Sequence, residues 1–130
     1  MTSVDTNVIV RLVTSDDPLQ ARRAARLISR ERVYVTKTAL LEAEWVLRGA
    51  YDLPRAVIHR SLVSFLGLPQ VTVEDGIAVR AALDAYGAGL DFADAMHLAS
   101  SHDCARFATL DRKVRRDAPR ISVKIATVAP

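Results

Sequence analysis

The sequence predicts an α/β protein in which helices cover both faces of a parallel sheet. Two observations lead to this fold class. Short β-branched or aromatic runs alternate with helical patterns along the chain, and turn or cap residues bound most of these runs. The length of 130 residues suits one domain, and neither a repeat, a low-complexity tract nor a linker interrupts the pattern. We therefore expect a single domain over residues 1–130.

Five short runs are the predicted strands. The first contains Val4 and is followed at once by Asp5. The other four occupy residues 32–35, 71–73, 106–110 and 122–125. Most of these residues are β-branched or aromatic, and such side chains pack well on a pleated sheet.

Cap residues mark six helices in the intervals between these strands. The predicted starts lie after Asp5-Thr6-Asn7 and at Asp17-Pro18, Thr36, Leu53-Pro54, Glu74 or Asp75, and Asp91. Three of the predicted ends lie near Arg48, Leu66 and Gly87. Helices that connect successive strands make those strands parallel, and parallel sheets bind ligands at the carboxyl ends of their strands.

The net charge, the cysteine count and the lengths of the apolar runs limit the kinds of partner and compartment to be expected. The formal net charge of +3 and the pI near 9.4 permit a polyanionic partner without requiring one. The single cysteine, Cys104, excludes an internal disulfide framework and suits a reducing compartment, and we expect it to be a small buried apolar residue. Asp5 interrupts any apolar signal-peptide run, and no stretch is long enough to span a bilayer. We expect a cytoplasmic protein without membrane contact.

Asp5 and Asp111 each follow a predicted strand directly, at the edge where such sheets bind ligands. Each is also a good helix cap; capping is the simpler explanation of Asp5, whereas capping and a functional role explain Asp111 equally well. Three capping residues in a row, Asp5-Thr6-Asn7, exceed what one helix start needs and favour a site there.

Glu42 and Glu44 share one helix, and their neighbours distinguish them. Glu44 has Arg48 four residues further on and is expected to form an ordinary solvated pair. Glu42 has no cation at helical spacing and lies toward apolar neighbours. We therefore expect Glu42 to need a partner from elsewhere in the chain.

Asp91 and Asp94 lie at the start of another helix. Asp91 is the natural cap, with Asp94 in the position of a capping box. On a helical wheel, Asp94 borders the buried stripe that contains Leu98, so Asp91 can cap the helix while Asp94 serves a site. We interpret His97 as a supporting or surface residue rather than a ligand.

The four acids Asp5, Glu42, Asp94 and Asp111 would repel one another if the fold gathered them. Carboxylate oxygens favour hard cations such as Mg²⁺ or Mn²⁺, and the chain has no Cys/His spacing typical of zinc. Acids around such ions are typical of phosphodiester chemistry.

Four stretches carry a family resemblance: Val4–Val8, Glu42–Leu47, Asp91–Ala95 and Ala108–Asp111. The chain resembles the PIN-domain nucleases, and specifically the VapC-type toxins of toxin–antitoxin pairs, in which these stretches occur in the same order. The resemblance covers nearly the whole chain. The resemblance implies a three-layer α/β/α sandwich with a mostly parallel central sheet. It also implies metal-dependent endoribonuclease activity, homodimerisation, and inhibition by a small antitoxin whose C-terminal segment enters the active-site groove.

The resemblance also assigns roles. The metal-binding positions match Asp5, Glu42, Asp94 and Asp111. Thr6 and Asn7 match the small polar residues beside the first acid, and Thr109 matches the hydroxyl residue two before the last. Asp91 is a cap, an extra ligand or both.

The resulting hypothesis is hydrolysis of an RNA phosphodiester by metal-activated water, with Mg²⁺ or Mn²⁺ as the cofactor. Five basic residues are candidates for contact with backbone phosphates: Arg112, Lys113, Arg115, Arg116 and, in the first helix, Arg11. A second cluster of arginines lies between residues 22 and 32, and a solvated helix face explains it more simply.

Two other functions compete with this hypothesis. A phosphotransfer domain also places acids at strand ends, but it needs a lysine near a later strand, and Lys124 lies inside a predicted strand. A non-catalytic PIN-like scaffold would bind RNA or protein without cutting. The intact set of acids argues against such a scaffold. The sequence identifies neither the RNA target nor the number of metal ions.

Overall fold

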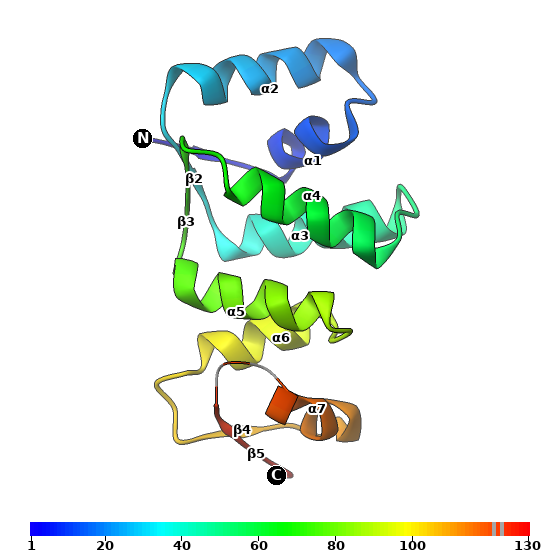
Figure 1. The fold of residues 1–130 in the computed structure, drawn as a ribbon, viewed down its shortest axis with the longest axis vertical. Helices are drawn as coiled ribbons and strands as arrows, with labels where there is room; N and C mark the ends of the chain where they lie inside the picture. The colour runs from blue at the N-terminus through cyan, green and yellow to red at the C-terminus, as the bar shows by residue number, and fades with distance from the viewer. Residues whose placement is uncertain (121, 123) are drawn as a thin grey trace. The chain divides into compact units, whose positions relative to one another are not determined.

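The computed structural model describes residues 1–120, 122 and 124–130. The chain divides into two compact units, Met1–Glu74 and Asp75–Pro130. Figure 1 shows the path of the chain through the helices and short strands of both units. The mixture of helices with parallel strands confirms the predicted α/β fold class.

A parallel three-stranded sheet organises the first unit. Its strands are β1 (Thr2–Val4), β2 (Val33–Val35) and β3 (Val71–Val73), and they lie in the order β1-β2-β3. The register places Val4 beside Val35 and Val35 beside Val73. Since the three strands end at the same level, the residues that follow them lie along one edge of the sheet.

Four helices complete this unit: α1 (Thr6–Thr14), α2 (Pro18–Arg30), α3 (Lys37–Gly49) and α4 (Arg55–Leu66). Asp17 caps α2, with Pro18 at its first position, and Thr36 caps α3, as the sequence predicted. The core consists of fully buried aliphatic side chains from the sheet and the helices, including Ile9, Val33, Val35, Leu40, Leu47, Ile58 and Leu62.

The second unit begins with the helices α5 (Gly76–Gly87) and α6 (Phe92–Ser100). The rings of Tyr86 and Phe92 pack at a centroid distance of 5.1 Å and are both buried. A parallel pair of strands, β4 (Arg106–Ala108) and β5 (Ala126–Val128), follows with α7 (Arg112–Asp117) and a 3-10 turn at Ala118–Arg120 between them.

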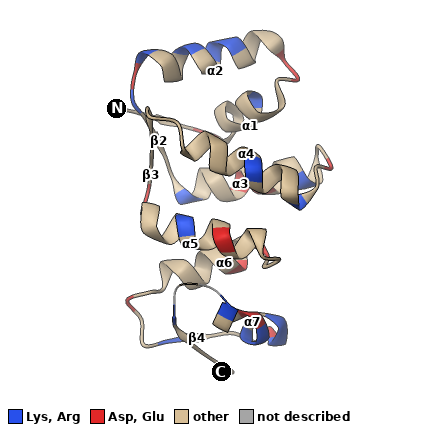
Figure 2. Ribbon diagram, viewed as in Figure 1, with Lys and Arg blue, Asp and Glu red and all other residues tan. Residues whose placement is uncertain are grey.

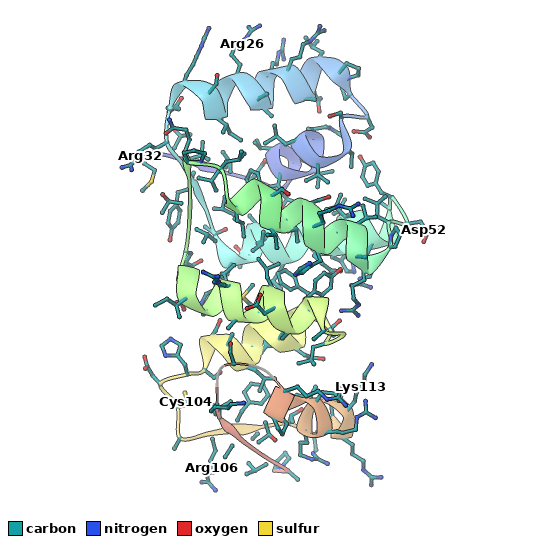
Figure 3. The ribbon with its side chains drawn as sticks, in the orientation of Figure 1. Arg26, Arg32, Asp52, Cys104, Arg106 and Lys113 are labelled. Atoms are coloured by element: carbon teal, nitrogen blue, oxygen red, sulfur yellow. The ribbon has the colours of Figure 1, made fainter. Side chains whose placement is uncertain are left out.

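Three expectations for this unit were wrong in detail. The fourth strand ends at Ala108 rather than Leu110, because the chain turns at Thr109 into α7, a helix for which the sequence offered Asp111 as a cap but no predicted range. The fifth strand lies at Ala126–Val128 rather than at residues 122–125, of which Val123 lies outside the described residues. Cys104 is exposed in a turn rather than buried, and its side chain is labelled in Figure 3.

The helices were also compared with the length and apolar character of membrane-spanning segments. Among the described residues, none of the helices combines the length and the apolar character that a bilayer crossing requires.

Candidate functional site

Asp5 follows β1 and begins α1. Its Oδ1 accepts a hydrogen bond of 3.2 Å from the backbone N–H of Val8, so Asp5 is the N-cap of the helix. Next to it, the buried Thr6 donates from its hydroxyl to the carbonyl of Ala39 at 3.4 Å, and this bond ties α1 to α3. Asn7 is exposed in the first turn of α1. The carboxylate of Asp5 is therefore the helix cap that the sequence predicted, and it is also the predicted site residue.

A hollow of about 370 Å³ lies at this edge of the sheet. Asp5 and Glu42, one from the start of α1 and the other from α3, both line it. The remaining lining residues are Ser3, Val4, Thr6, Thr36, Thr38 and Ala39. The structure thus brings together two of the predicted acids of the first unit, with hydroxyl groups around them.

The contrast expected between Glu42 and Glu44 was wrong, because the exposure of the two residues is reversed. Glu44 is only 4% exposed, and Glu42 is exposed to solvent. Leu40, Ala43 and Leu47 are fully buried, and helical spacing places Glu44 on the same face as these three residues. The predicted pair with Arg48 is present, with Arg48 Nε 2.9 Å from Glu44 Oε2. Glu42 meets solvent in the hollow rather than apolar neighbours.

Three further polar residues at this edge were missed as site residues. Thr36 follows β2, and its hydroxyl lies 3.1 Å from that of Thr38. Glu74 follows β3, and its Oε1 accepts a hydrogen bond of 2.8 Å from the backbone N–H of Lys37 at the start of α3. The signal was available in the sequence, since Thr36 and Glu74 follow their strands as directly as Asp5 follows the first.

In the second unit, Asp91 and Asp94 share the start of α6. Asp91 is the N-cap, and its Oδ1 accepts from the backbone N–H of Asp94 at 3.0 Å. Burial raises the pKa of the half-buried Asp94, and the negative charges of Asp91 and Asp111 raise it further. Asp111 comes from a different part of this unit, so the fold brings both Asp91 and Asp111 within electrostatic reach of Asp94.

A hydrogen-bonded turn holds Asp111 at the start of α7. Asp111 Oδ1 accepts from the backbone N–H of Lys113 at 2.8 Å, and the Asp111 N–H donates to the hydroxyl of Thr109 at 3.1 Å. Arg115 Nη1 donates to the carbonyl oxygen of Thr109 at 2.6 Å. Thr109 and Arg115 therefore fix the turn that positions Asp111.

The predicted phosphate-binding residues differ in how strongly the protein itself engages them. Arg112 and Lys113 are exposed on α7, and Figure 3 labels Lys113 there. Arg116 Nε lies 3.0 Å from Oδ1 of the buried Asp117, and this contact lowers the pKa of Asp117. Arg11 contacts Gln20, Asp16 and Tyr51 within the first unit. Arg112 and Lys113 are thus the members of this set best placed for an external anion.

The donor chemistry in each unit fits a hard divalent cation. Carboxylate and hydroxyl oxygens line the hollow beside Asp5, and such oxygens are the donors that these ions prefer. Burial, and then the charges of Asp91 and Asp111, raise the pKa of Asp94, and a cation bound beside this carboxylate would oppose both effects. Within the described residues, no three His, Cys, Asp or Glu side chains gather closely enough to form a metal-binding group by themselves.

Comparison with known proteins places these features in a family. No curated protein matches the chain. The model of the PIN domain matches residues 3–118 and so includes all four predicted acids. PIN domains are generally metal-dependent nucleases that act on nucleic acid, which agrees with acids at the carboxyl ends of parallel strands. Because the match covers most of the chain, this protein belongs to the PIN domain family, and its function is of the nuclease type.

Proposed function

We propose that this protein is a Mg²⁺- or Mn²⁺-dependent endoribonuclease and the VapC-type toxin of a type II toxin–antitoxin pair. One observation carries the proposal most strongly. The fold places Asp94 where burial opposes its charge, and it brings the carboxylates of Asp91 and Asp111, from two elements of one unit, within electrostatic reach of it. A bound cation would favour the charged form of Asp94 in this setting, and a carboxylate with a perturbed pKa beside other acids supports a metal-dependent activity.

Asp5, Asp94 and one or both of Glu42 and Asp111 are the proposed ligands, with Asp91 as a cap or an additional ligand. A bound Mg²⁺ or Mn²⁺ ion supplies charge that neutralises the phosphate and lowers the pKa of water. The helix caps limit how the carboxylates can move. One carboxylate oxygen accepts a hydrogen bond from a backbone N–H in each of Asp5, Asp91 and Asp111. The second oxygen of each is left for another contact.

The other proposed roles belong to residues that orient or attract. Thr6 links α1 to α3, and Thr109 holds the turn before Asp111. Asn7 presents a polar side chain in the first turn of α1, beside Asp5. Arg112 and Lys113 attract the RNA backbone, and a carboxylate of the site accepts the proton of the attacking water.

A cleavage assay with matched variants tests this function. The purified chain is incubated with structured and single-stranded RNAs in Mg²⁺, Mn²⁺ or EDTA, beside Asp5→Asn and Asp94→Asn. The controls Asp52→Asn and Asp84→Asn remove the same charge from exposed acids outside the site, and Figure 3 labels Asp52. Asp52 has a φ of 51°, a conformation that Asn tolerates well.

We expect cutting that needs the metal and both site acids and is unchanged in the controls. Cutting that persists in EDTA or in Asp5→Asn would show the proposal to be wrong. If the folded protein neither cuts RNA nor binds Mn²⁺, the chain is a non-catalytic scaffold.

The toxin assignment implies two protein partners and a location. A small antitoxin is expected to block the site, and a second copy of the chain is expected to form a homodimer in the cytoplasm. Co-expression with the product of an adjacent small reading frame tests the first partner, since the antitoxin should abolish cutting. Light scattering of the purified chain tests the second.

A further inference from the structure

Helix α2 carries a continuous stripe of arginines. It has four of them, Arg22, Arg23, Arg26 and Arg30, and no acid lies within its bounds. All four are exposed, whereas Ala24 and Ile28 face the core. Arg22, Arg26 and Arg30 are four residues apart, so they lie one above another at a spacing of about 6 Å along the helix axis. Figure 2 shows their blue segments following α2.

The protein pairs other arginines of this unit but not these. Arg11 binds Asp16, and Arg48 binds Glu44. In the part of the chain that the structure describes, none of the four arginines of α2 lies in an ion pair.

The acids close to α2 in sequence are engaged elsewhere. Asp17 accepts from the backbone N–H of Gln20, Asp16 accepts from Tyr51, and Glu31 accepts from the hydroxyl of Thr2. The positive charge of the stripe is therefore left for a ligand from outside the unit.

A groove connects the stripe with the start of α1. It has a volume of about 340 Å³ and lies between α1 and α2. Its lining residues are Asn7, Val8, Arg11, Gln20, Arg23, Ala24 and Leu27. At one end of the groove, Arg23 belongs to the stripe. At the other end, Val8 donates a hydrogen bond from its backbone N–H to Asp5. The groove thus runs within the first unit from Arg23 of α2 to the first turn of α1, the helix that Asp5 caps.

We propose that the arginine stripe of α2 binds the phosphate backbone of the RNA and that the groove beside it leads the strand toward Asp5. This inference rests on the proposed function and adds the surface that receives the substrate. Guanidinium groups match phosphate oxygens in geometry as well as charge. The stripe contains no aromatic residue, so it recognises the backbone rather than the bases.

The exposed surface of α2 fits an RNA better than a protein partner. Two small residues, Ala25 and Ser29, lie between the arginines, and the larger Leu19 is confined to the start of the helix. Protein interfaces are usually centred on buried aromatic anchors with arginines around them, and α2 offers the arginines without any aromatic residue. An acidic antitoxin segment is the competing occupant, and the experiment distinguishes it from RNA.

The test measures RNA binding without cutting. Fluorescence anisotropy of a labelled poly(U) oligonucleotide in EDTA gives the dissociation constant at several salt concentrations. For single strands, each phosphate contact contributes about 0.7 to the slope of log K against log salt. The triple variant Arg22→Ala/Arg26→Ala/Arg30→Ala should therefore lower that slope by about 2. Alanine is a strong helix former, so the variant should keep α2 intact, as circular dichroism would verify.

A control variant removes the same charge from exposed arginines elsewhere: Arg60→Ala/Arg80→Ala/Arg106→Ala. We expect its slope to stay close to that of the parent protein. An unchanged slope in the α2 variant, or an equal loss in the control, overturns the proposal. So does an α2 variant that binds RNA normally but no longer binds an acidic antitoxin. If the parent chain never cuts RNA yet the α2 variant alone loses slope, the surface stands and only the nuclease proposal fails.

Discussion

At the scale of single residues, the candidate acids combine two tasks that a sequence presents as alternatives. Asp5, Asp91 and Asp111 are helix N-caps and are also members of the proposed metal-binding set. A carboxylate has two oxygens, and capping uses one of them. The helix start therefore fixes the side chain while leaving an oxygen for a ligand, so the two interpretations do not compete.

This double role predicts different outcomes for two substitutions of Asp5. Asn caps a helix about as well as Asp, whereas Ala costs about 1 kcal/mol of stability at this position. Both Asp5→Asn and Asp5→Ala should abolish RNA cutting, but only Asp5→Ala should lower the melting temperature, by roughly 3–5 °C. Thermal denaturation followed by circular dichroism measures the difference. Equal stability of the two variants would show that Asp5 does not act as a cap in solution.

Asp94 should oppose stability in the absence of metal. Its folded pKa is raised by burial and then by Asp91 and Asp111, so the stability that its protonated form provides is lost as the pH rises through the folded pKa. In EDTA at pH 7, Asp94→Asn should therefore melt at a higher temperature than the parent protein. The gap should narrow in acid, where Asp94 is protonated. A variant less stable at pH 7, or a gap independent of pH, would contradict this assignment.

The contrast between Glu42 and Glu44 shows what a sequence cannot predict at this scale. Local spacing correctly paired Glu44 with Arg48, because that interaction is confined to one helix. It did not predict which side of α3 would be buried. Burial depends on the elements that pack against the helix, and those contacts come from distant parts of the chain.

At the scale of elements, a polar network ties the α1–α2 loop to the α3–α4 loop. The hydroxyl of Tyr51 donates to Asp16 Oδ2 at 2.6 Å, and Arg11 Nη1 lies 2.9 Å from Asp16 Oδ1. Thr14 donates its hydroxyl to the same Oδ1. The bond from Tyr51 is the main cause of a lowered pKa at Asp16.

A lowered folded pKa means that Asp16 stabilises the protein above its ordinary pKa, and that this contribution is lost as the pH falls through the folded pKa. Asp16→Asn should therefore lower the melting temperature at pH 7, and the loss should disappear in strong acid. Melting curves between pH 7 and pH 2.5 test this, with Asp52→Asn as the control from the connected loop. A deficit that stays constant down to the lowest pH would mean that the charge of Asp16 is irrelevant.

Elements with a local signal were predictable, and elements without one were not. The starts of α2 and α3 were predicted from Asp17, Pro18 and Thr36, because helix capping depends on neighbouring residues alone. Helix α7 is short and has few apolar residues. The sequence around Asp111 was therefore equally compatible with the end of a strand and with the start of a helix. The fifth strand begins at Ala126, and pairing with β4 rather than β-propensity decides its position.

At the scale of the whole molecule, the four proposed metal ligands come from both compact units. Asp5 and Glu42 belong to Met1–Glu74, and Asp94 and Asp111 belong to Asp75–Pro130. The PIN domain model matches residues 3–118 and so extends through most of both units. The prediction of one domain therefore leads to a thermodynamic test of whether acids from the two units serve a common ion.

A ligand that binds only the folded protein stabilises it, by about 2.7 kcal/mol when its concentration is one hundred times its dissociation constant. Saturating Mn²⁺ should thus raise the melting temperature of the parent protein by several degrees. Asp5→Asn and Asp94→Asn should each remove most of this increase, while Asp52→Asn and Asp84→Asn should keep it. If the two site acids act on a common ion, the double variant loses little more than either single variant, because one lost ligand already abolishes binding. Additive losses would instead indicate separate ions in the two units, and an increase that survives in all variants would place the ion elsewhere.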